Sequence, residues 1–205
     1  MRNIKIFLDR AKEHSFKESA SLLLKALFKA DRIDIYMNDL SNDYEKELPI
    51  EKTYNIDKGA AEDLKKWKKE YDPTPWELMV DEYDEIDDFF VCKTKDGRLA
   101  HISWIYSSKD KNRIMFLKID EAEIKYSLTF PEFRGESLFP TTLLEIRRYL
   151  KKKGYKKLFI NVLENNLASK RGISKAGFKK IAKMRLVKIM GIQLSKKYSY
   201  SKEIQ

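Results

Sequence analysis

The stretch that decides the fold reads IKYSLTFPEFRG (124–135) and continues as ESLFPTTLLEIRRYLKKKG (136–154). Its first part predicts a strand, its first proline a turn, and its remainder a helix from about Phe139 to Lys153. The first turn of a helix presents backbone N–H groups without intrahelical acceptors, at the positive end of the helix dipole. The order strand, turn, helix therefore predicts a site for an anion such as pyrophosphate, to which Arg134 adds a positive charge.

A second segment with the same organisation follows directly. The sequence KLFINVL (157–163) predicts a strand, and NNLASKRGISKAGF (165–178) predicts a helix from about Leu167 to Ala176 that ends at Gly177. Two closing strands are then expected, Phe178–Ile189 and Ile192–Tyr200.

The chain before these segments predicts an antiparallel meander with helices on its N-terminal side. The expected strands are Arg32–Met37, Glu51–Ile56, Phe89–Thr94, Leu99–Tyr106, Arg113–Ile119 and Ala122–Phe130, and the expected helices are Lys58–Tyr71 and Pro75–Tyr83. Apolar residues between Ile4 and Lys29 recur at three- and four-residue spacings, which predicts an amphipathic helix or helix pair. We therefore expect an N-terminal helical extension (1–38) and one further domain (39–205). The fold class is α/β (α+β), a mixed, mostly antiparallel twisted sheet with helices on both faces.

Composition excludes several classes of protein. The 205 residues are 42% hydrophobic and 12% aromatic, too apolar for a disordered chain. No stretch approaches the roughly 18 apolar residues of a membrane span, and no secretory signal is evident, so we expect a cytoplasmic protein without a membrane partner. The single cysteine, Cys92, excludes an internal disulfide, and with only two histidines we expect no metal.

The net charge of +10 is unevenly distributed. Residues 39–90 hold seventeen acidic and seven basic side chains, net −10, whereas residues 134–202 hold nineteen basic and three acidic ones, net +16. A basic half attracts phosphates, either those of a nucleotide cofactor or those of a nucleic acid. Charge alone does not choose between them, and a lysine-rich helix is also an ordinary solvated surface.

The first segment resembles the acetyl-coenzyme A (acetyl-CoA) motif of the GNAT superfamily of N-acetyltransferases. In that superfamily a strand ending near a proline leads into Arg-Gly-x-Gly-x-Gly or Arg-Gly-x-Gly-x-Ala and then a helix. Arg134 and Gly135 match this pattern. Ser137 and Phe139 stand where the superfamily has small residues, so the glycine pattern is incomplete.

The second segment resembles the superfamily's Asn-x-x-Ala/Ser motif with its Gly-Phe ending. Asn166, Ser169, Gly177 and Phe178 fill those positions, and the two motifs have the right order and separation. The resemblance spans about residues 89–190. Within the superfamily it is nearest to bacterial members associated with surface-glycan synthesis.

The resemblance implies a cofactor site along both segments. Backbone groups near Leu128 would hold the pantetheine arm and stabilise the oxyanion, the pyrophosphate would lie over the amides that open the following helix, and Asn166, or alternatively Asn165, would contact the cofactor. The same Ser, Pro, Thr and Asn residues are also ordinary helix caps, and that interpretation stays open. The cofactor residues implied are Leu128, Thr129, Phe130, Arg134, Gly135, Glu136, Ser137, Leu138, Phe139, Thr141, Thr142, Asn166 and Ser169.

The chemical step implied is attack of a neutral amine on a thioester, which needs a base for the ammonium proton and an acid for the thiolate. Superfamily members often carry a glutamate at the start of the cofactor strand, which implies Glu123 as the base, with Glu121 as the alternative. A solvent-facing glutamate is the competing interpretation. The tyrosine that many relatives use as the acid is replaced by Ile173, so another donor or water must serve.

Strand alternation places Glu123, Lys125, Ser127 and Thr129 on one face of the cofactor strand. The leading hypothesis is an acyl-CoA-dependent N-acyltransferase that moves an acetyl group from acetyl-CoA to a primary amine of a small molecule, with an amino sugar as one candidate. One alternative is a non-catalytic GNAT-like module that binds acyl-CoA or a partner. A second is a nucleic-acid-binding protein, which only the basic half favours. A homodimer is compatible with the sequence.

Overall fold

The computed structural model describes residues 28–42, 54–189 and 192–200. The described residues divide into two compact units, a larger one within residues 35–180 and a smaller one that takes in 28–34, 181–189 and 192–200. The N-terminal helices expected over Ile4–Lys29 fall outside the described residues except at their end, where Phe28 already begins a strand. Within the described ranges, no helix is long and apolar enough to cross a membrane.

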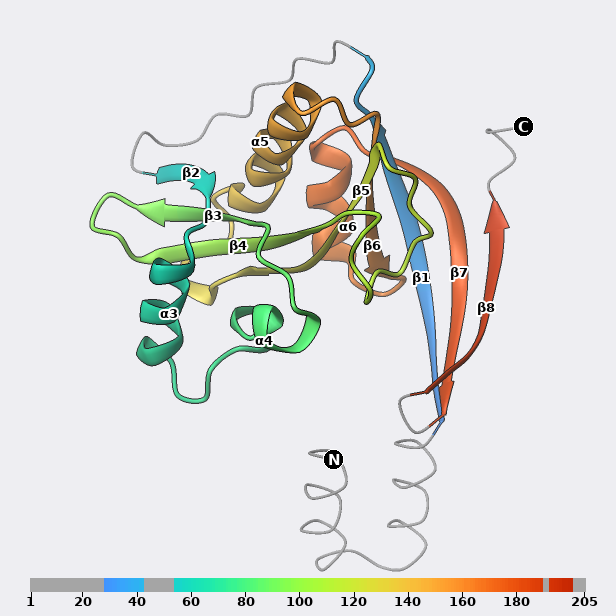
Figure 1. The fold of residues 1–205 in the computed structure, drawn as a ribbon, viewed down its shortest axis with the longest axis horizontal. Coiled ribbons are helices and arrows are strands. Elements are labelled where there is room, and N and C mark those ends of the chain that lie inside the picture. The colour runs from blue at the N-terminus through green and yellow to red at the C-terminus, as the bar shows by residue number, and fades with distance from the viewer. Residues whose placement is uncertain (1–27, 43–53, 190–191, 201–205) are drawn as a thin grey trace, which may run out of the picture. The chain divides into compact units, whose positions relative to one another are not determined.

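A mixed sheet forms the centre of the larger unit (Figure 1). Its hydrogen-bonded order is β2-β3-β4-β5-β6-β1, in which β2 to β5 pair antiparallel and β5 pairs parallel with β6. This confirms the predicted sheet type. The strands are β1 (Phe28–Asp39), β2 (Tyr54–Lys58), β3 (Phe89–Thr94), β4 (Leu99–Tyr106), β5 (Glu121–Thr129) and β6 (Lys157–Leu163).

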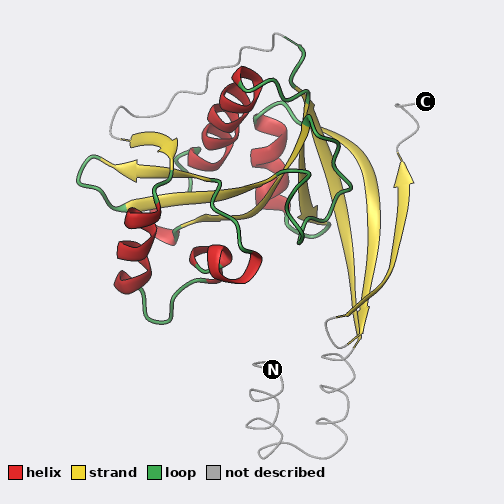
Figure 2. Ribbon diagram, viewed as in Figure 1, coloured by secondary structure: helices red, strands yellow, loops and turns green. Residues whose placement is uncertain are grey.

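Helices cover both faces of this sheet, as predicted (Figure 2). On one face lie α3 (Ala61–Glu70), the short 3-10 helix η1 (Trp76–Leu78) and α4 (Val80–Asp84), and on the other lie α5 (Leu138–Lys152) and α6 (Leu167–Lys175). A second 3-10 helix, η2 (Pro131–Phe133), connects β5 to α5. Each face has its own apolar core: Trp67, Leu78 and Trp104 belong to the first, and Leu143, Ile146 and Ile160 to the second.

The smaller unit contains the first residues of β1, all of β7 (Lys179–Ile189) except its first two residues, and β8 (Ile192–Tyr200). Its strand order is β1-β7-β8. β7 and β8 pair antiparallel from Ala182↔Tyr200 to Ile189↔Ile192. Both predicted closing strands are therefore confirmed.

The segment Arg113–Ile119, for which the apolar spacing predicts a strand, is a loop. Its backbone N–H groups bind a carboxylate instead of a neighbouring strand: Ile114 and Met115 donate to Glu123 at 3.0 and 2.7 Å. A segment whose backbone donors are satisfied by a buried side chain needs no strand partner. The prediction is wrong because the composition of such a loop is that of a strand.

A β-bulge divides β5 into two halves. The register between β4 and β5 shifts between Ile102 and Trp104, so that Tyr126 and Ser127 together oppose Ser103. Tyr126 has a left-handed φ of 48°. Two residues opposite one is the defining geometry of a bulge, and it reverses the alternation of the side chains that follow.

The single alternation expected along this strand is therefore wrong. Before the bulge, Lys125 lies opposite Trp104 and faces the core beneath α3 and η1, as does Glu123 two residues earlier. After the bulge, Ser127 and Thr129 line a cavity beside α5 and α6. One strand thus presents two different polar pairs to the two faces of the sheet.

Candidate cofactor site

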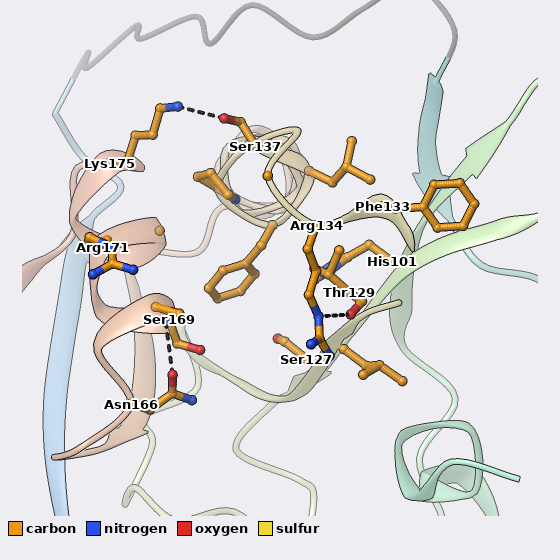
Figure 3. A pocket seen from close by; sticks show the side chains of 17 residues that line it. His101, Ser127, Thr129, Phe133, Arg134, Ser137, Asn166, Ser169, Arg171 and Lys175 are labelled. Carbon is orange, nitrogen blue, oxygen red and sulfur yellow. Dashed lines mark hydrogen bonds between the residues drawn. The ribbon is translucent and has the colours of Figure 1, made fainter. Parts of the chain in front are cut away.

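A cavity of about 660 Å³ opens beside the second half of β5, next to the N-terminal end of α5 and to α6 (Figure 3). This volume lies within the roughly 300–1,000 Å³ that is usual for small-molecule sites. The structure brings together residues from both sequence motifs. The cavity is lined by many of the expected cofactor residues, namely Leu128, Thr129, Arg134, Gly135, Ser137, Leu138, Phe139, Asn166 and Ser169.

The part of β5 that borders the cavity has one edge without a strand partner among the described strands. The parallel pairing of β5 with β6 runs only from Glu121↔Lys157 to Ile124↔Ile160 in the described strands. Beyond Ile124, β5 pairs with β4 alone. Backbone N–H and C=O groups on a free strand edge bind an extended, amide-containing ligand in the way that they would bind another strand.

The first turn of α5 has the geometry of an anion site. Gly135 (φ 95°) and Ser137 (φ 61°) both have a left-handed backbone, which turns the chain into the helix. The N–H of Thr141 donates to the carbonyl of Ser137 at 3.2 Å, the first bond of the helix ladder. The amides of Leu138 and Phe139 precede it and have no acceptor within the helix, so they can bind a phosphate.

Three cationic side chains surround this anion site. Arg134, which the first motif includes, donates from Nε to the carbonyl of Thr129 at 3.2 Å. Arg171 and Lys175, which neither motif includes, line the cavity from α6. The four-residue spacing of Arg171 and Lys175 places both on one face of the helix, and this spacing is the sequence signal that indicates them as cavity residues.

Lys175 connects the two helices at the mouth of the cavity. Its Nζ donates to the hydroxyl of Ser137 at 2.7 Å (Figure 3). The ammonium therefore lies beside the amides of the α5 first turn, where it adds its charge to the helix dipole. Ser137, which replaces a glycine of the motif, supplies the hydroxyl that holds it.

Phe139, which replaces another small residue of the motif, packs where α6 carries Gly172. A Cβ atom at position 172 would lie 2.8 Å from Cδ1 of the Phe139 ring, closer than carbon atoms approach without displacement. The same ring lies 5.5 Å from the His101 imidazole, measured between centroids. The large residue on α5 and the glycine on α6 are therefore sterically linked.

The remaining expected cofactor residues of the loop and helix lie beside the cavity without lining it. Phe130 is buried, and the carboxylate of Glu136 accepts a hydrogen bond from the Tyr54 hydroxyl. The hydroxyls of Thr141 and Thr142 donate to backbone carbonyls one turn earlier in the chain, both at 2.9 Å. A hydroxyl bound to its own backbone is no longer a free donor for a ligand.

Asn166 is the N-cap of α6 as well as a cavity residue. Its side-chain oxygen accepts a hydrogen bond from the N–H of Ser169 at 3.1 Å (Figure 3). The capping interpretation is therefore confirmed, and because the cap uses the amide oxygen it is compatible with a ligand contact through Nδ2. The alternative, Asn165, is exposed and does not line the cavity.

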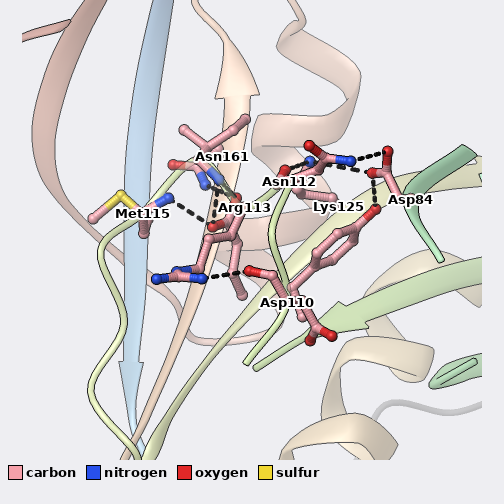
Figure 4. Close-up of polar contacts among 10 residues, drawn as sticks. Asp84, Asp110, Asn112, Arg113, Met115, Lys125 and Asn161 are labelled. Atoms are coloured by element: carbon pink, nitrogen blue, oxygen red, sulfur yellow. Dashed lines mark hydrogen bonds and ion pairs between the residues drawn. The ribbon is translucent and has the colours of Figure 1, made fainter. Parts of the chain in front are cut away.

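Glu123 is fully buried and lies opposite Tyr106, on the face of the sheet away from the cavity. Its partners Met115 and Asn161 belong to the polar cluster in Figure 4. Besides the two loop amides, Nδ2 of Asn161 donates to its carboxylate at 2.7 Å. Burial raises the pKa of Glu123 above its ordinary value, while the N–H donors and the nearby Lys125 charge act in the opposite direction. Glu121 is also buried and accepts from the N–H of Lys118 at 3.0 Å. The solvent-facing interpretation of these glutamates is therefore wrong.

A chain of four hydrogen-bonded side chains, which no motif marks, lies in and behind the cavity wall. Nδ1 of His101 contacts the hydroxyl of Thr129 at 2.7 Å, and its Nε2 contacts the hydroxyl of Ser103 at 2.8 Å. The Ser103 hydroxyl in turn contacts that of Ser127 at 2.7 Å. Burial lowers the pKa of His101 to about 3, so the ring is neutral at pH 7.

Two further side chains that bear on the chemistry are inert in this fold. Ile173, at the position of the usual acid, is 1% exposed and belongs to the core between α5, α6 and the sheet. Burial raises the pKa of the Cys92 thiol to about 12, which excludes a thiolate nucleophile near neutral pH.

Solved structures with the same arrangement of elements identify the fold. An acetyltransferase of the GNAT family from Colwellia psychrerythraea matches with a TM-score of 0.55 and 16% identity, over 82% of this chain and 57% of that chain. A GCN5-related N-acetyltransferase from Sphaerobacter thermophilus matches with a TM-score of 0.57 and 14% identity, over 86% of this chain and 58% of that one. This chain has the GNAT fold.

A third structure with the GNAT fold belongs to a larger protein. It is described as a GCN5-related glucosamine N-acetyltransferase region of a fungal multi-domain GH3 β-N-acetylglucosaminidase, and it matches with a TM-score of 0.56 and 13% identity, over 85% of this chain and 23% of that chain. The present chain thus spans less than two thirds of each of these relatives. No family profile and no curated protein sequence matches it. At these identities the likeness establishes the GNAT fold, and the function has to be argued from the site.

Proposed function

We propose that the protein is an acyl-CoA-dependent N-acyltransferase that transfers an acetyl group to the primary amine of a small molecule. One observation carries the proposal: a single cavity joins the free edge of β5 to the first turn of α5 and to the cations of α6. The strand edge suits an amide-containing chain, and the helix end with its cations suits phosphates. Acyl-CoA has both parts in one molecule, so these residues fit it.

In this proposal each part of the cavity has one role. The backbone of Leu128 to Phe130 binds the pantetheine arm, and the amides of the α5 first turn bind the pyrophosphate together with Lys175 and Arg171. Arg134 holds the Thr129 carbonyl through Nε, which leaves the terminal N–H groups of its guanidinium for a phosphate oxygen. Acyl-CoA bound there supplies a thioester carbonyl, and a backbone N–H near Leu128 stabilises the oxyanion.

We further propose an amino sugar as the acceptor class. The similar fungal region is described as a glucosamine N-acetyltransferase, which makes this acceptor the first to test. The acidic run Asp81–Asp88 on the other face of the sheet attracts ammonium groups to the protein. This part of the proposal stands or falls independently of the cofactor.

A non-catalytic acyl-CoA-binding module is the second candidate, and two observations favour it. Glu123 is bound to three N–H groups on the face of the sheet opposite the cavity, and its carboxylate does not line the cavity. Ile173 is packed in the core and has no proton to give. The cavity therefore lacks both of the acid–base groups that the GNAT resemblance implies.

Two measurements on the native chain separate these functions. Isothermal titration calorimetry with CoA, acetyl-CoA and a short RNA shows which ligand class binds. Lys66→Ala, which removes a positive charge from the exposed face of α3, serves as the control for variants that remove a cation from the cavity. Release of free thiol from acetyl-CoA is then followed over a panel of amines that begins with amino sugars. Absence of CoA binding refutes both candidates, and binding without amine-dependent thiol release refutes the transferase in favour of the module.

A further inference from the structure

The chain of four side chains starts and ends at the cavity. Ser127 and Thr129 both line it, because the bulge brings the second half of β5 to this face. Behind them, the neighbouring strand β4 carries His101 and Ser103, which are fully buried. The contacts run from Ser127 to Ser103 at 2.7 Å, from Ser103 to His101 at 2.8 Å and from His101 to Thr129 at 2.7 Å. Two points of the cavity wall are thus connected through the protein.

Chemistry restricts this chain to two arrangements of its protons. A neutral imidazole has one donor and one acceptor nitrogen, and each hydroxyl donates one hydrogen. If Nδ1 of His101 carries the proton, Thr129 accepts from it and its own hydrogen points to the cavity, while Ser127 donates inward and presents a lone pair. The other tautomer reverses every bond. The two arrangements differ by one proton moved from one end to the other.

We propose that this chain is the proton relay of the transfer reaction, an inference that rests on the proposed N-acyltransferase function. As the C–N bond forms and the C–S bond breaks, Ser127 accepts the proton that leaves the amine nitrogen. Ser127 passes its own proton to Ser103, and Ser103 passes one to Nε2 of His101. Nδ1 then passes a proton to Thr129, and the Thr129 hydroxyl protonates the leaving sulfur. One proton leaves the nitrogen, one reaches the sulfur, and no residue changes its charge.

The order of the two ends agrees with the proposed position of the cofactor. Thr129 lies on the side of the α5 first turn, where the phosphates and the adjoining pantetheine arm are proposed, so the sulfur is on its side. Ser127 is two residues further from that turn, on the side from which an acceptor meets the thioester. Exchange with water at the two cavity hydroxyls restores the first tautomer after product release.

A neutral relay also resolves the lack of acid–base groups in the cavity. A base that stores the proton needs a pKa near the working pH, which His101, at about 3, does not have. A relay needs no stored charge, because each member gives one proton as it takes another. Burial that keeps His101 neutral therefore favours this role, whereas it excludes His101 as a conventional general base.

The decisive variant is Ser103→Ala. Ser103 does not line the cavity, so this change interrupts the chain in its middle and leaves the cavity wall intact. We expect kcat for thiol release to fall about 10²-fold, the lower range for loss of a proton-transfer group, with unchanged calorimetric affinity for CoA. Thr74→Val is the matched control, because it removes a hydrogen-bonded hydroxyl near α3 that is not part of the chain.

A second pair of variants guards against a folding defect. Thr129→Val keeps the shape of the side chain without its hydroxyl and should lose turnover, whereas Thr129→Ser keeps the hydroxyl and should retain it. The solvent deuterium isotope effect on kcat should report several protons in the native chain and fewer in Ser103→Ala. A purely structural role would change stability without separating valine from serine at position 129.

An observation independent of activity completes the test. In protein labelled with ¹⁵N-histidine, the His101 imidazole should remain neutral from pH 7 to below pH 5, and Ser103→Ala should shift its Nε2 resonance. If Ser103→Ala keeps the kcat of the native protein, the relay is refuted while the transferase function stands. A His101 ring that becomes protonated near pH 6 has the same consequence. A native protein without amine-dependent thiol release overturns the transferase function itself, and the relay with it.

Discussion

Replacing Glu123 by alanine should destabilise the protein much more than its single missing side chain suggests. The carboxylate accepts from the backbone N–H groups of Ile114 and Met115 and from Nδ2 of Asn161, at 3.0, 2.7 and 2.7 Å. All three donors lose this acceptor in Glu123→Ala. A fully buried donor that loses its acceptor costs about 1–3 kcal/mol, and because these three contacts are part-buried, entry of water reduces the sum to about 3–5 kcal/mol.

This loss is large enough to measure in a simple assay. In a domain of this size, 1 kcal/mol corresponds to about 2–4 °C in Tm, so Tm should fall by roughly 6–20 °C in a calorimetric scan. Amide hydrogen exchange should accelerate locally at Ile114 and Met115, because the loop 113–119 is no longer held to the sheet. Glu123→Gln keeps one acceptor oxygen and should lie between the native protein and Glu123→Ala.

Glu85→Ala is the control for this prediction, because the side chain of that glutamate is 80% exposed and its ion pair, to the exposed Lys111 at 3.7 Å, contributes little. A Tm of Glu123→Ala equal to that of the control would refute the reasoning. The same variants test the expectation that Glu123 is the catalytic base. Glu123→Gln with native turnover removes that expectation, and the position of the residue across the sheet from the cavity makes this the result we expect.

Three further predictions concern the cavity. Burial lowers the pKa of His101 in the folded protein to about 3, against 6.5 in the unfolded chain, so the free energy of unfolding declines as pH falls from 6.5 towards 3. Measured by urea unfolding, the decline between pH 7 and 4.5 should be about 2–3 kcal/mol smaller in His101→Gln than in the native protein. Gly172→Ala should destabilise the native chain by about 1–2 kcal/mol through contact with Phe139 but be neutral or stabilising in Phe139→Ala, and equal effects in both backgrounds would contradict the steric link. Lys175→Ala should weaken CoA binding about tenfold, or about 1.4 kcal/mol, by calorimetry, with a smaller effect at high salt.

Most elements of the fold follow from local pattern. β6 and β8 have the predicted bounds, and α5 and α6 are one residue from theirs. These segments have clear signals, such as Gly154 and Gly177, whose left-handed backbone ends the helices. Local pattern is sufficient there because neighbouring residues determine the structure.

Local pattern fails where a distant residue decides. The loop 113–119 has the composition of a strand, and the carboxylates of Glu123 and Glu121, which accept from its backbone N–H groups, explain why it is none. The cavity residues are similar in this respect. The motifs mark the segments around Arg134 and Asn166, but His101 becomes part of the site only through the pairing of β4 with β5, which no single segment encodes.

Phe139 and Gly172 show why a motif can look incomplete while its site is intact. Position by position, a phenylalanine in place of a small residue is a lost feature of the cofactor loop. In the folded chain, Gly172 on the adjoining helix leaves the space that the Phe139 ring occupies, so the two positions form one unit. A motif comparison that reads each position separately counts such a unit as damage.

The bulge in β5 has a consequence for how such a strand changes over time. Deleting one residue at Tyr126 would restore a regular alternation and would turn Ser127 and Thr129 away from the cavity while leaving the amino-acid composition almost unchanged. A change in length by one residue is therefore a larger step here than most substitutions. Among related chains, those that keep this extra residue should be compared for catalysis separately from those that lack it, because the same letters then stand on opposite sides of the sheet.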